Sequence, residues 1–149
     1  MVCRERLISS TYLYDMKVCF KNITKIFTPI QIDAIKDFIL LCQEQVPLIN
    51  DVEIDFVSER KGSMTTGVRM PKNKICILSQ NRLLIDILRT LSHEWVHEIQ
   101  HQKLGVKDTD KIQDIGGPEE NMSNILSGVL VKKFEKKYPN YSTILYGED

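Results

Sequence analysis

The sequence predicts an α+β domain in which a small sheet is packed on one side by about three helices. Two observations support this fold class. The chain has 149 residues, a length that fits one domain, and its hydrophobic patterns run in the order strand, helix, strands, helix, helix. We place the single domain at residues 16–149 and interpret residues 1–15 as an N-terminal extension outside the main fold.

The first third of the chain predicts a strand and then a helix. Residues 17–27 are rich in β-branched and aromatic side chains, which favour a strand. Thr28 suits a helix N-cap, Pro29 suits the first helical position, and Pro47 ends the helix. Between these points apolar residues recur at helical spacing, namely Ile32, Ile35, Phe38, Ile39, Cys42 and Val46.

The middle of the chain predicts strands followed by a long helix. Residues 51–57 alternate polar and apolar side chains, as a half-buried strand does. Residues 68–78 predict one or two further strands, and Pro71 within them suits an edge strand or a hairpin bend. After Asn81 the pattern becomes helical and stays so to about Lys103.

The last part of the chain predicts a loop and a final helix. Residues 105–117 are polar and contain glycines, which indicates a loop. Pro118 opens the helix, two acids follow in its positively polarised first turn, and Pro139 ends it. We interpret the tail, residues 140–149, as mobile or strand-like.

Charge, hydropathy and cysteine usage exclude several classes of protein. Lys and Arg together number 20, as do Asp and Glu, so the net charge gives no reason to expect a nucleic-acid partner. No apolar run has the length of a membrane helix or of a signal peptide. The cysteines form no C-x-x-C pair, which argues against a zinc ribbon or a disulfide scaffold and predicts reduced thiols in the cytoplasm; they are Cys3, Cys19, Cys42 and Cys76.

Residues 93–97 read His-Glu-Trp-Val-His, the H-E-x-x-H pattern. Residues four apart on a helix lie on one face, so His93 and His97 can both reach one zinc ion at about 2.0–2.1 Å. Glu94 lies beside that position and can take a proton from a water that zinc acidifies to a pKa of about 7. The apolar stripe of the same helix points elsewhere and consists of Leu84, Ile87, Leu88, Leu91, Trp95 and Ile99.

A catalytic zinc ion takes three protein ligands and keeps one position open, so a third ligand must come from another part of the fold. His101 extends the histidine spacing, but it lies about 12 Å along the helix axis from His93. Gln100 and Lys103 occupy the Gly and His positions of the longer metzincin pattern, which excludes that family. The remaining candidates are acids that could also simply complement a helix dipole: Glu119 and Glu120, with Asp114 a weaker choice.

Residues 93–97 and 120–123 together resemble the motifs of the gluzincin metallopeptidases. The sequence Glu120-Asn121-Met122-Ser123 begins 23 positions after the second histidine. In gluzincins a later helix supplies a glutamate ligand, often with a small residue three positions on. Glu120 with Ser123 fits that arrangement and Glu119 fits it poorly, so the resemblance selects Glu120 as the third ligand. It is closest to small single-domain gluzincins of phages and bacteria, including relatives of phage-repressor-cleaving proteases, and covers roughly residues 74–138.

This resemblance implies a minimal zincin-like fold with an edge strand beside the cleft. We expect that strand at Lys74–Leu78, where it would line the cleft and pair with substrate as an added strand. The resemblance does not assign a residue that stabilises the oxyanion. Three tyrosines near the C-terminus stay unassigned for that role, namely Tyr138, Tyr141 and Tyr146.

The expected function is therefore zinc-dependent hydrolysis of peptide bonds. His93, His97 and Glu120 would bind the metal, and Glu94 would act as general base. The expected partner is a peptide or protein substrate, with no nucleic acid and no membrane, in the cytoplasm or, for a phage protein, the host cytoplasm. The alternative is a zinc-binding regulatory or interaction protein with the same fold and little turnover.

Overall fold

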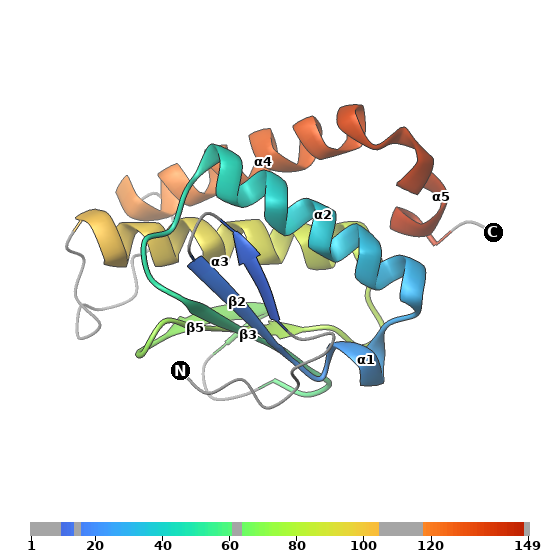
Figure 1. The fold of residues 1–149 in the computed structure, drawn as a ribbon, viewed down its shortest axis with the longest axis horizontal. Helices are drawn as coiled ribbons and strands as arrows, with labels where there is room; N and C mark the ends of the chain where they lie inside the picture. Colours follow the sequence, from blue (N-terminus) through green and yellow to red (C-terminus); the bar gives the residue numbers. More distant parts are fainter. Residues whose placement is uncertain (1–9, 14–15, 61–63, 105–117, 148–149) are drawn as a thin grey trace.

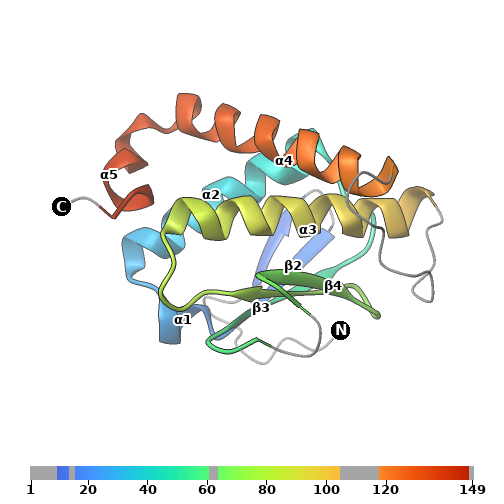
Figure 2. The same cartoon turned by 180° about the vertical axis from the view of Figure 1, so that it is seen from behind.

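The computed structural model describes residues 10–13, 16–60, 64–104 and 118–147. These residues form a mixed α+β fold in which one five-stranded sheet lies below the long helices (Figure 1). Helices α2 and α3 cover one face of the sheet, and α4 lies on the far side of these two helices from the sheet (Figures 1 and 2). The predicted fold class and the one-sided packing are confirmed at this level.

The strand order is β1-β2-β3-β5-β4. The parallel centre of the sheet consists of β2 (Met16–Lys21), β3 (Val52–Val57) and β5 (Lys74–Leu78). The antiparallel strands β1 (Ser10–Leu13) and β4 (Gly67–Met70) flank this centre. Strand β4 runs beneath α3, as Figure 2 shows.

The predicted position of the edge strand is wrong. Strand β5 at Lys74–Leu78 lies between β3 and β4, so the edge beside the active helix is β4. Burial explains the difference: the three central residues of β5 are buried, whereas all four residues of β4 are only partly buried. The more apolar strand of the hairpin therefore takes the inner position, where both of its backbone edges are paired.

The first predicted strand is too long, and the predicted extension is too large. Strand β2 ends at Lys21, and a short helix, α1 (Ile23–Ile26), follows it. Asn22 separates the two with a positive φ of 67°, a conformation that asparagine tolerates. Residues 10–13 of the predicted extension pair as β1 with β2 and cover its backbone edge, so the domain begins before Met16. Residues 1–9 lie outside the described residues.

Helix α2 (Pro29–Gln45) begins where the sequence predicts. The Thr28 hydroxyl accepts a hydrogen bond from the Gln31 backbone N–H, and the Gln31 side chain accepts one from the Thr28 N–H at 2.9 Å. This reciprocal capping satisfies two amide groups that would otherwise lack a helical partner. The helix ends at Gln45, two residues before the proline that predicted its end, and Val46 is its C-cap.

Helix α3 (Leu84–Leu104) carries the predicted apolar stripe into the core. All six stripe residues are at most 6% exposed, namely Leu84, Ile87, Leu88, Leu91, Trp95 and Ile99. The Trp95 indole N–H also donates to the Val46 carbonyl oxygen at 2.8 Å and so ties α3 to the end of α2. None of the described helices has both the length and the apolar character needed to cross a membrane.

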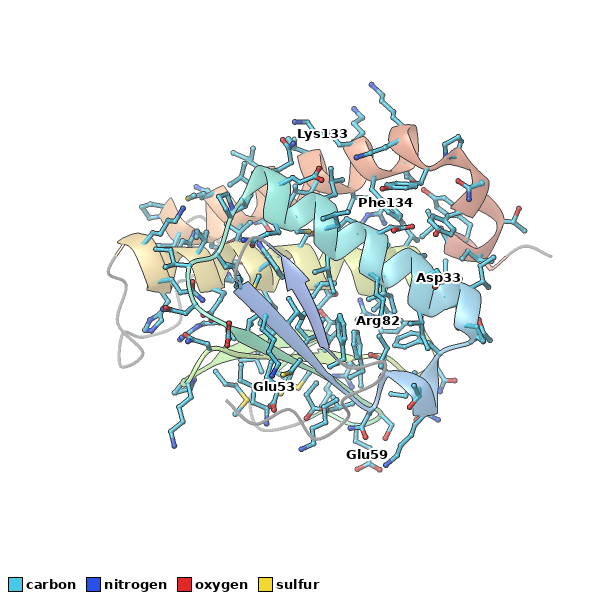
Figure 3. The ribbon with its side chains drawn as sticks, viewed as in Figure 1. Asp33, Glu53, Glu59, Arg82, Lys133 and Phe134 are labelled. Atoms are coloured by element: carbon cyan, nitrogen blue, oxygen red, sulfur yellow. The ribbon has the colours of Figure 1, made fainter. Side chains whose placement is uncertain are left out.

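Helix α4 (Pro118–Lys137) begins at the predicted proline, but the tail after it is helical, contrary to the prediction. A 3-10 turn at Pro139–Tyr141 leads into α5 (Ser142–Leu145). Aromatic packing explains the order of this tail, because the Tyr141 ring stacks on Phe134 of α4. The ring of Phe134, which is labelled in Figure 3, in turn meets Phe38 of α2 edge-on. The predicted loop at 105–117 lies outside the described residues.

Candidate metal centre

The two motif histidines lie side by side on α3. Their Nε2 atoms are 3.1 Å apart, and each side chain is about one-fifth exposed. Residues at i and i+4 of a helix share a face, which brings the two rings together without help from the rest of the fold. The buried stripe of α3 turns the opposite side of the helix into the core. Both rings therefore lie at the surface that α4 covers in part.

Helix α4 adds Glu120 to this pair. Its Oε1 is 2.8 Å from His93 Nε2, and its Oε2 is 3.1 Å from His97 Nε2. Helices α3 and α4 pack closely against each other, and the fully buried Ser123 one turn after Glu120 is small enough to permit this approach. His93, His97 and Glu120, hereafter the donor cluster, present ligand atoms within 4.8 Å of one another and could hold a metal ion.

The other candidate ligands are not part of the donor cluster. Among the described residues, the cluster includes neither Glu119 nor His101. Glu119 contributes its backbone instead, since its carbonyl oxygen accepts a hydrogen bond from the Gln100 side chain at 2.8 Å. Asp114 lies outside the described residues.

The favoured protonation state of His93 is the neutral one that a metal ligand needs. Burial lowers the pKa of His93, and this effect is larger than the opposing attraction of the Glu120 carboxylate. The neutral imidazole is therefore favoured near pH 7, and only a neutral imidazole offers a nitrogen lone pair. The donor set of two imidazoles and one carboxylate is one that transition-metal ions accept.

Glu94 is buried next to the donor cluster, with 7% of the residue exposed. Burial raises the pKa of Glu94 to about 8, the negative charge of Glu120 adds to the rise, and a hydrogen bond from the Arg69 backbone N–H opposes it. A cation in the donor cluster would favour the carboxylate form and lower this pKa. Glu94 is thus a carboxyl group that can both take and release a proton near neutral pH.

Arg69 of β4 contacts two acids on α3 that are one turn apart. Its backbone N–H bonds to Glu94, and its side-chain Nε donates to Glu98 Oε1 at 2.7 Å. Glu98 is fully buried, and its second oxygen accepts a hydrogen bond from Gln102 at 2.6 Å. These contacts hold the edge strand against the active helix at the position of Glu94. The sequence analysis missed Arg69, because no local pattern relates residues on β4 to residues on α3.

Gly67 allows β4 to lie close to α3. A Cβ atom at this position would lie 2.4 Å from Thr90 Cγ2 and 3.2 Å from Glu94 Cγ. Only glycine avoids this overlap without a shift of the helix or the strand. The Leu78 N–H donates to the Thr66 carbonyl, so by antiparallel alternation Gly67 and Arg69 direct their backbone groups away from β5.

A cavity of about 680 Å³ lies beside Thr66, the residue directly before β4. Arg82 lines it and donates to the Thr90 hydroxyl at 2.8 Å, and Thr90 in turn lies 3.5 Å from the Thr66 hydroxyl. The cavity therefore continues the line of the edge strand beyond Gly67. Its lining is mostly polar and includes Ser58, Thr66, Leu78, Gln80, Asn81 and Arg82.

The second side chain that the sequence analysis missed is Gln100. Its Oε1 lies 2.9 Å from His97 Nδ1, on the side of the ring away from the donor cluster. The sequence analysis used Gln100 only to exclude the metzincin pattern. Its spacing of three residues from His97 was the available signal, because residues at i and i+3 of a helix are neighbours.

The three tyrosines near the C-terminus have structural contacts. Tyr141 donates to Asp37, Tyr146 donates to Glu135, and Tyr138 packs on Phe134. Along α4, the position of Tyr138 is about 27 Å from the donor cluster at 1.5 Å per residue. These contacts give none of the three a role at the cluster.

Comparison with known proteins adds no family to this description. No family model, no curated protein and no solved structure matches the chain significantly. The site must therefore be interpreted from its own residues.

Proposed function

We propose that this chain is a zinc-dependent metallopeptidase in which His93, His97 and Glu120 bind the metal and Glu94 is the general base. One observation carries the proposal: three ligand atoms from two helices converge within 4.8 Å, and a buried glutamate adjoins them. Two histidines and one glutamate form a ligand set typical of catalytic zinc. A tetrahedral zinc ion holds its ligand atoms about 3.3 Å apart, close to the 2.8–3.1 Å between atoms of this cluster.

Glu94 supplies the proton transfers of the proposed reaction. When bound, zinc polarises a carbonyl oxygen and lowers the pKa of a water molecule. The Glu94 carboxylate takes a proton from the attacking water and then delivers it to the amine that leaves. The hydrogen bond from the Arg69 backbone holds the carboxylate in place for both transfers.

The edge strand β4 is the proposed platform for the substrate. The resemblance to gluzincins leads us to expect an edge strand that pairs with an extended peptide, and β4 rather than β5 occupies that position. Gly67 and Arg69 direct backbone groups away from β5, where a peptide strand could add to the sheet. The Arg69 N–H already bonds to Glu94, so a peptide would pair with the other outward backbone groups of these two residues. The cavity beside Thr66 and Arg82 offers space for a substrate side chain.

Glu94 also favours an enzyme over a zinc-binding protein without turnover. Zinc binding alone needs only the three residues of the donor cluster, and Glu94 is not one of them. A buried carboxyl group costs free energy through lost solvation, which argues for a role that needs it.

The proposal is tested with purified protein and the Glu94→Gln variant. We expect about one zinc ion per chain in both proteins by elemental analysis, because glutamine keeps the shape of the side chain and the ligands are untouched. Cleavage of a peptide library is then followed by mass spectrometry. We expect the wild type to cleave some of the peptides, and the variant to cleave them about 10²–10⁴-fold more slowly, because that is the usual contribution of a general base.

The outcomes separate the alternatives. Zinc binding without cleavage of any peptide would support the regulatory protein, and a chain that binds no zinc would contradict both functions. Equal cleavage by wild type and Glu94→Gln would contradict the role of Glu94 as general base.

A further inference from the structure

We propose that Gln100 is a positioning residue that fixes the tautomer and orientation of His97 and links this ligand to the helix that carries Glu120. This inference rests on the proposed metal centre. Gln100 is 1% exposed, and both ends of its side-chain amide have partners. Its Oε1 lies 2.9 Å from His97 Nδ1, and its Nε2 donates to the Glu119 carbonyl at 2.8 Å.

The donor and acceptor of each hydrogen bond can be assigned step by step, from the Glu119 carbonyl to Gln100 and then to His97. A backbone carbonyl only accepts, so the Gln100 group that faces Glu119 must be the NH₂ group. The amide oxygen then faces His97, and because an amide oxygen also only accepts, His97 Nδ1 must carry the proton. Glu120 Oε2 lies 3.1 Å from His97 Nε2 and also only accepts, so in the metal-free protein both ring nitrogens face acceptors. With a cation in the donor cluster, Nε2 would offer its lone pair to the metal, and Gln100 would hold the ring proton on Nδ1.

Ser123 does not fix this tautomer by itself. Its hydroxyl lies 3.3 Å from His97 Nδ1, farther than the Gln100 oxygen. A hydroxyl can turn to donate or to accept, so it is compatible with either tautomer. Of the two neighbours of His97 Nδ1, Gln100 is the one whose role is determined by a further partner.

The same side chain also joins the two helices that supply ligands. Gln100 belongs to α3, and Glu119 lies in the first turn of α4, directly before Glu120. The bond from Gln100 to the Glu119 carbonyl therefore holds the backbone beside the third ligand. One buried amide thus orients a ligand on α3 and positions the segment that carries a ligand on α4.

The test compares Gln100→Met, Gln100→Glu and a matched control, Gln102→Met, for zinc affinity by competition with a chelator. Methionine keeps an unbranched side chain and loses both hydrogen bonds, so we expect zinc to bind about 10–100-fold more weakly. Glutamate keeps an acceptor for His97 but cannot donate to Glu119, so its affinity should lie between those of Gln100→Met and the wild type. Gln102 is also a hydrogen-bonded glutamine of α3, but its partners are Glu98 and the backbone at Ile49 and Asn50.

The control should keep wild-type zinc affinity within about threefold even if its stability falls, because Gln102 touches no residue of the donor cluster. Wild-type affinity in Gln100→Met, or an equal loss in Gln102→Met, would overturn the inference while leaving the proposed function intact. Failure of the wild type to bind zinc would contradict the proposed function instead.

A second measurement uses the zinc-loaded protein. Nitrogen-15 NMR of the imidazole rings reports which nitrogen of His97 carries the proton and which binds the metal. We expect the proton on Nδ1 in the wild type and in Gln100→Glu, and a mixture of tautomers in Gln100→Met. A His97 ring protonated on Nε2 in the wild type would overturn the inference.

Discussion

The donor cluster brings together the Nε2 atoms of His93 and His97 and the two carboxylate oxygens of Glu120. Lone pairs and carboxylate oxygens repel one another at 2.8–3.1 Å unless protons or a cation lie between them. The fold nevertheless holds them there through the helical spacing of the histidines and the packing of α4 on α3. At the residue scale, the arrangement fits either protons shared between these groups or a cation bound among them.

The choice between two adjacent acids can be tested directly. We expect Glu120→Ala to weaken zinc binding strongly, because it removes both oxygens from the donor cluster. Glu119→Ala keeps the backbone carbonyl that Gln100 contacts, so it should lose at most about 0.3–1 kcal/mol of stability from the helix dipole. Chelator competition measures the first effect and urea unfolding the second. Loss of zinc from Glu119→Ala alone would mean that α4 presents the other acid.

At the scale of elements, two contacts set the distance between β4 and α3. Gly67 permits a close approach opposite Thr90 and Glu94, and the buried ion pair of Arg69 with Glu98 holds the strand one turn farther along the helix. The edge strand and Glu94, the proposed general base, are therefore positioned by the same contacts. A change in either contact should affect both stability and cleavage.

Gly67→Ala tests the close approach. We expect the added methyl group to cost about 1–3 kcal/mol of unfolding free energy through overpacking, and to lower peptide cleavage about tenfold or more by displacing Glu94. Gly128→Ala on α4 is the control, since a Cβ there meets nothing within 4 Å. Alanine at that helical position should raise stability by about 0.5–1 kcal/mol. If Gly67→Ala kept wild-type stability and cleavage, β4 would be free to shift away from α3, and the close approach would not be required.

The ion pair between β4 and α3 is tested by a double-mutant cycle. Arg69→Met leaves the buried Glu98 carboxylate without its cation and should cost about 3–5 kcal/mol of unfolding free energy. Arg69→Met combined with Glu98→Met removes both charges, so the double variant should be more stable than the sum of the single losses predicts. Urea unfolding of the three variants gives the coupling energy. Strict additivity would mean that the two side chains do not interact.

At the scale of the whole molecule, the fold consists of a sheet, a middle layer of helices and an outer helix. Helix α3 in the middle layer contacts β4 and β5 on one side and α4 on the other. The donor cluster lies where α3 meets α4, and Glu94 lies where α3 meets β4. The position of α4 in the outer layer therefore decides whether Glu120, the proposed third ligand, reaches the two histidines.

The C-terminal tail fixes the far end of α4 through Tyr141. Its hydroxyl donates to Asp37 of α2 at 2.6 Å, and this bond raises the pKa of Tyr141 to about 12, with burial a smaller cause. We expect Tyr141→Phe to lower the unfolding free energy by about 1–2 kcal/mol at pH 7.

The pH dependence gives this prediction a specific sign. Because the folded pKa lies above the ordinary value of 10, the contribution of the bond is complete below about pH 10 and is lost as the pH rises through 12. The difference between wild type and Tyr141→Phe should therefore narrow over that range in urea unfolding. A difference that stays constant with pH would mean that the hydroxyl does not stabilise the fold through Asp37.

The sequence by itself determined the features that depend on neighbours within one or two helical turns. Thr28 and Pro29 marked the start of α2, and the apolar stripe of α3 identified its buried face. The H-E-x-x-H spacing was enough to place His93 and His97 together, because the geometry of one helix determines that distance. These predictions succeeded since no distant part of the chain could alter them.

Only the tertiary structure decided how the separate elements meet. It placed β4 rather than β5 at the edge, because burial in the sheet depends on both neighbours of a strand. Spacing alone left Glu119 and Glu120 as equal neighbours, and the resemblance favoured the second; the packing of α4 on α3 turned Glu120 toward the histidines. The supporting contacts of Arg69 and Gln100 likewise join elements that are far apart in the sequence, and such contacts arise only when the layers pack.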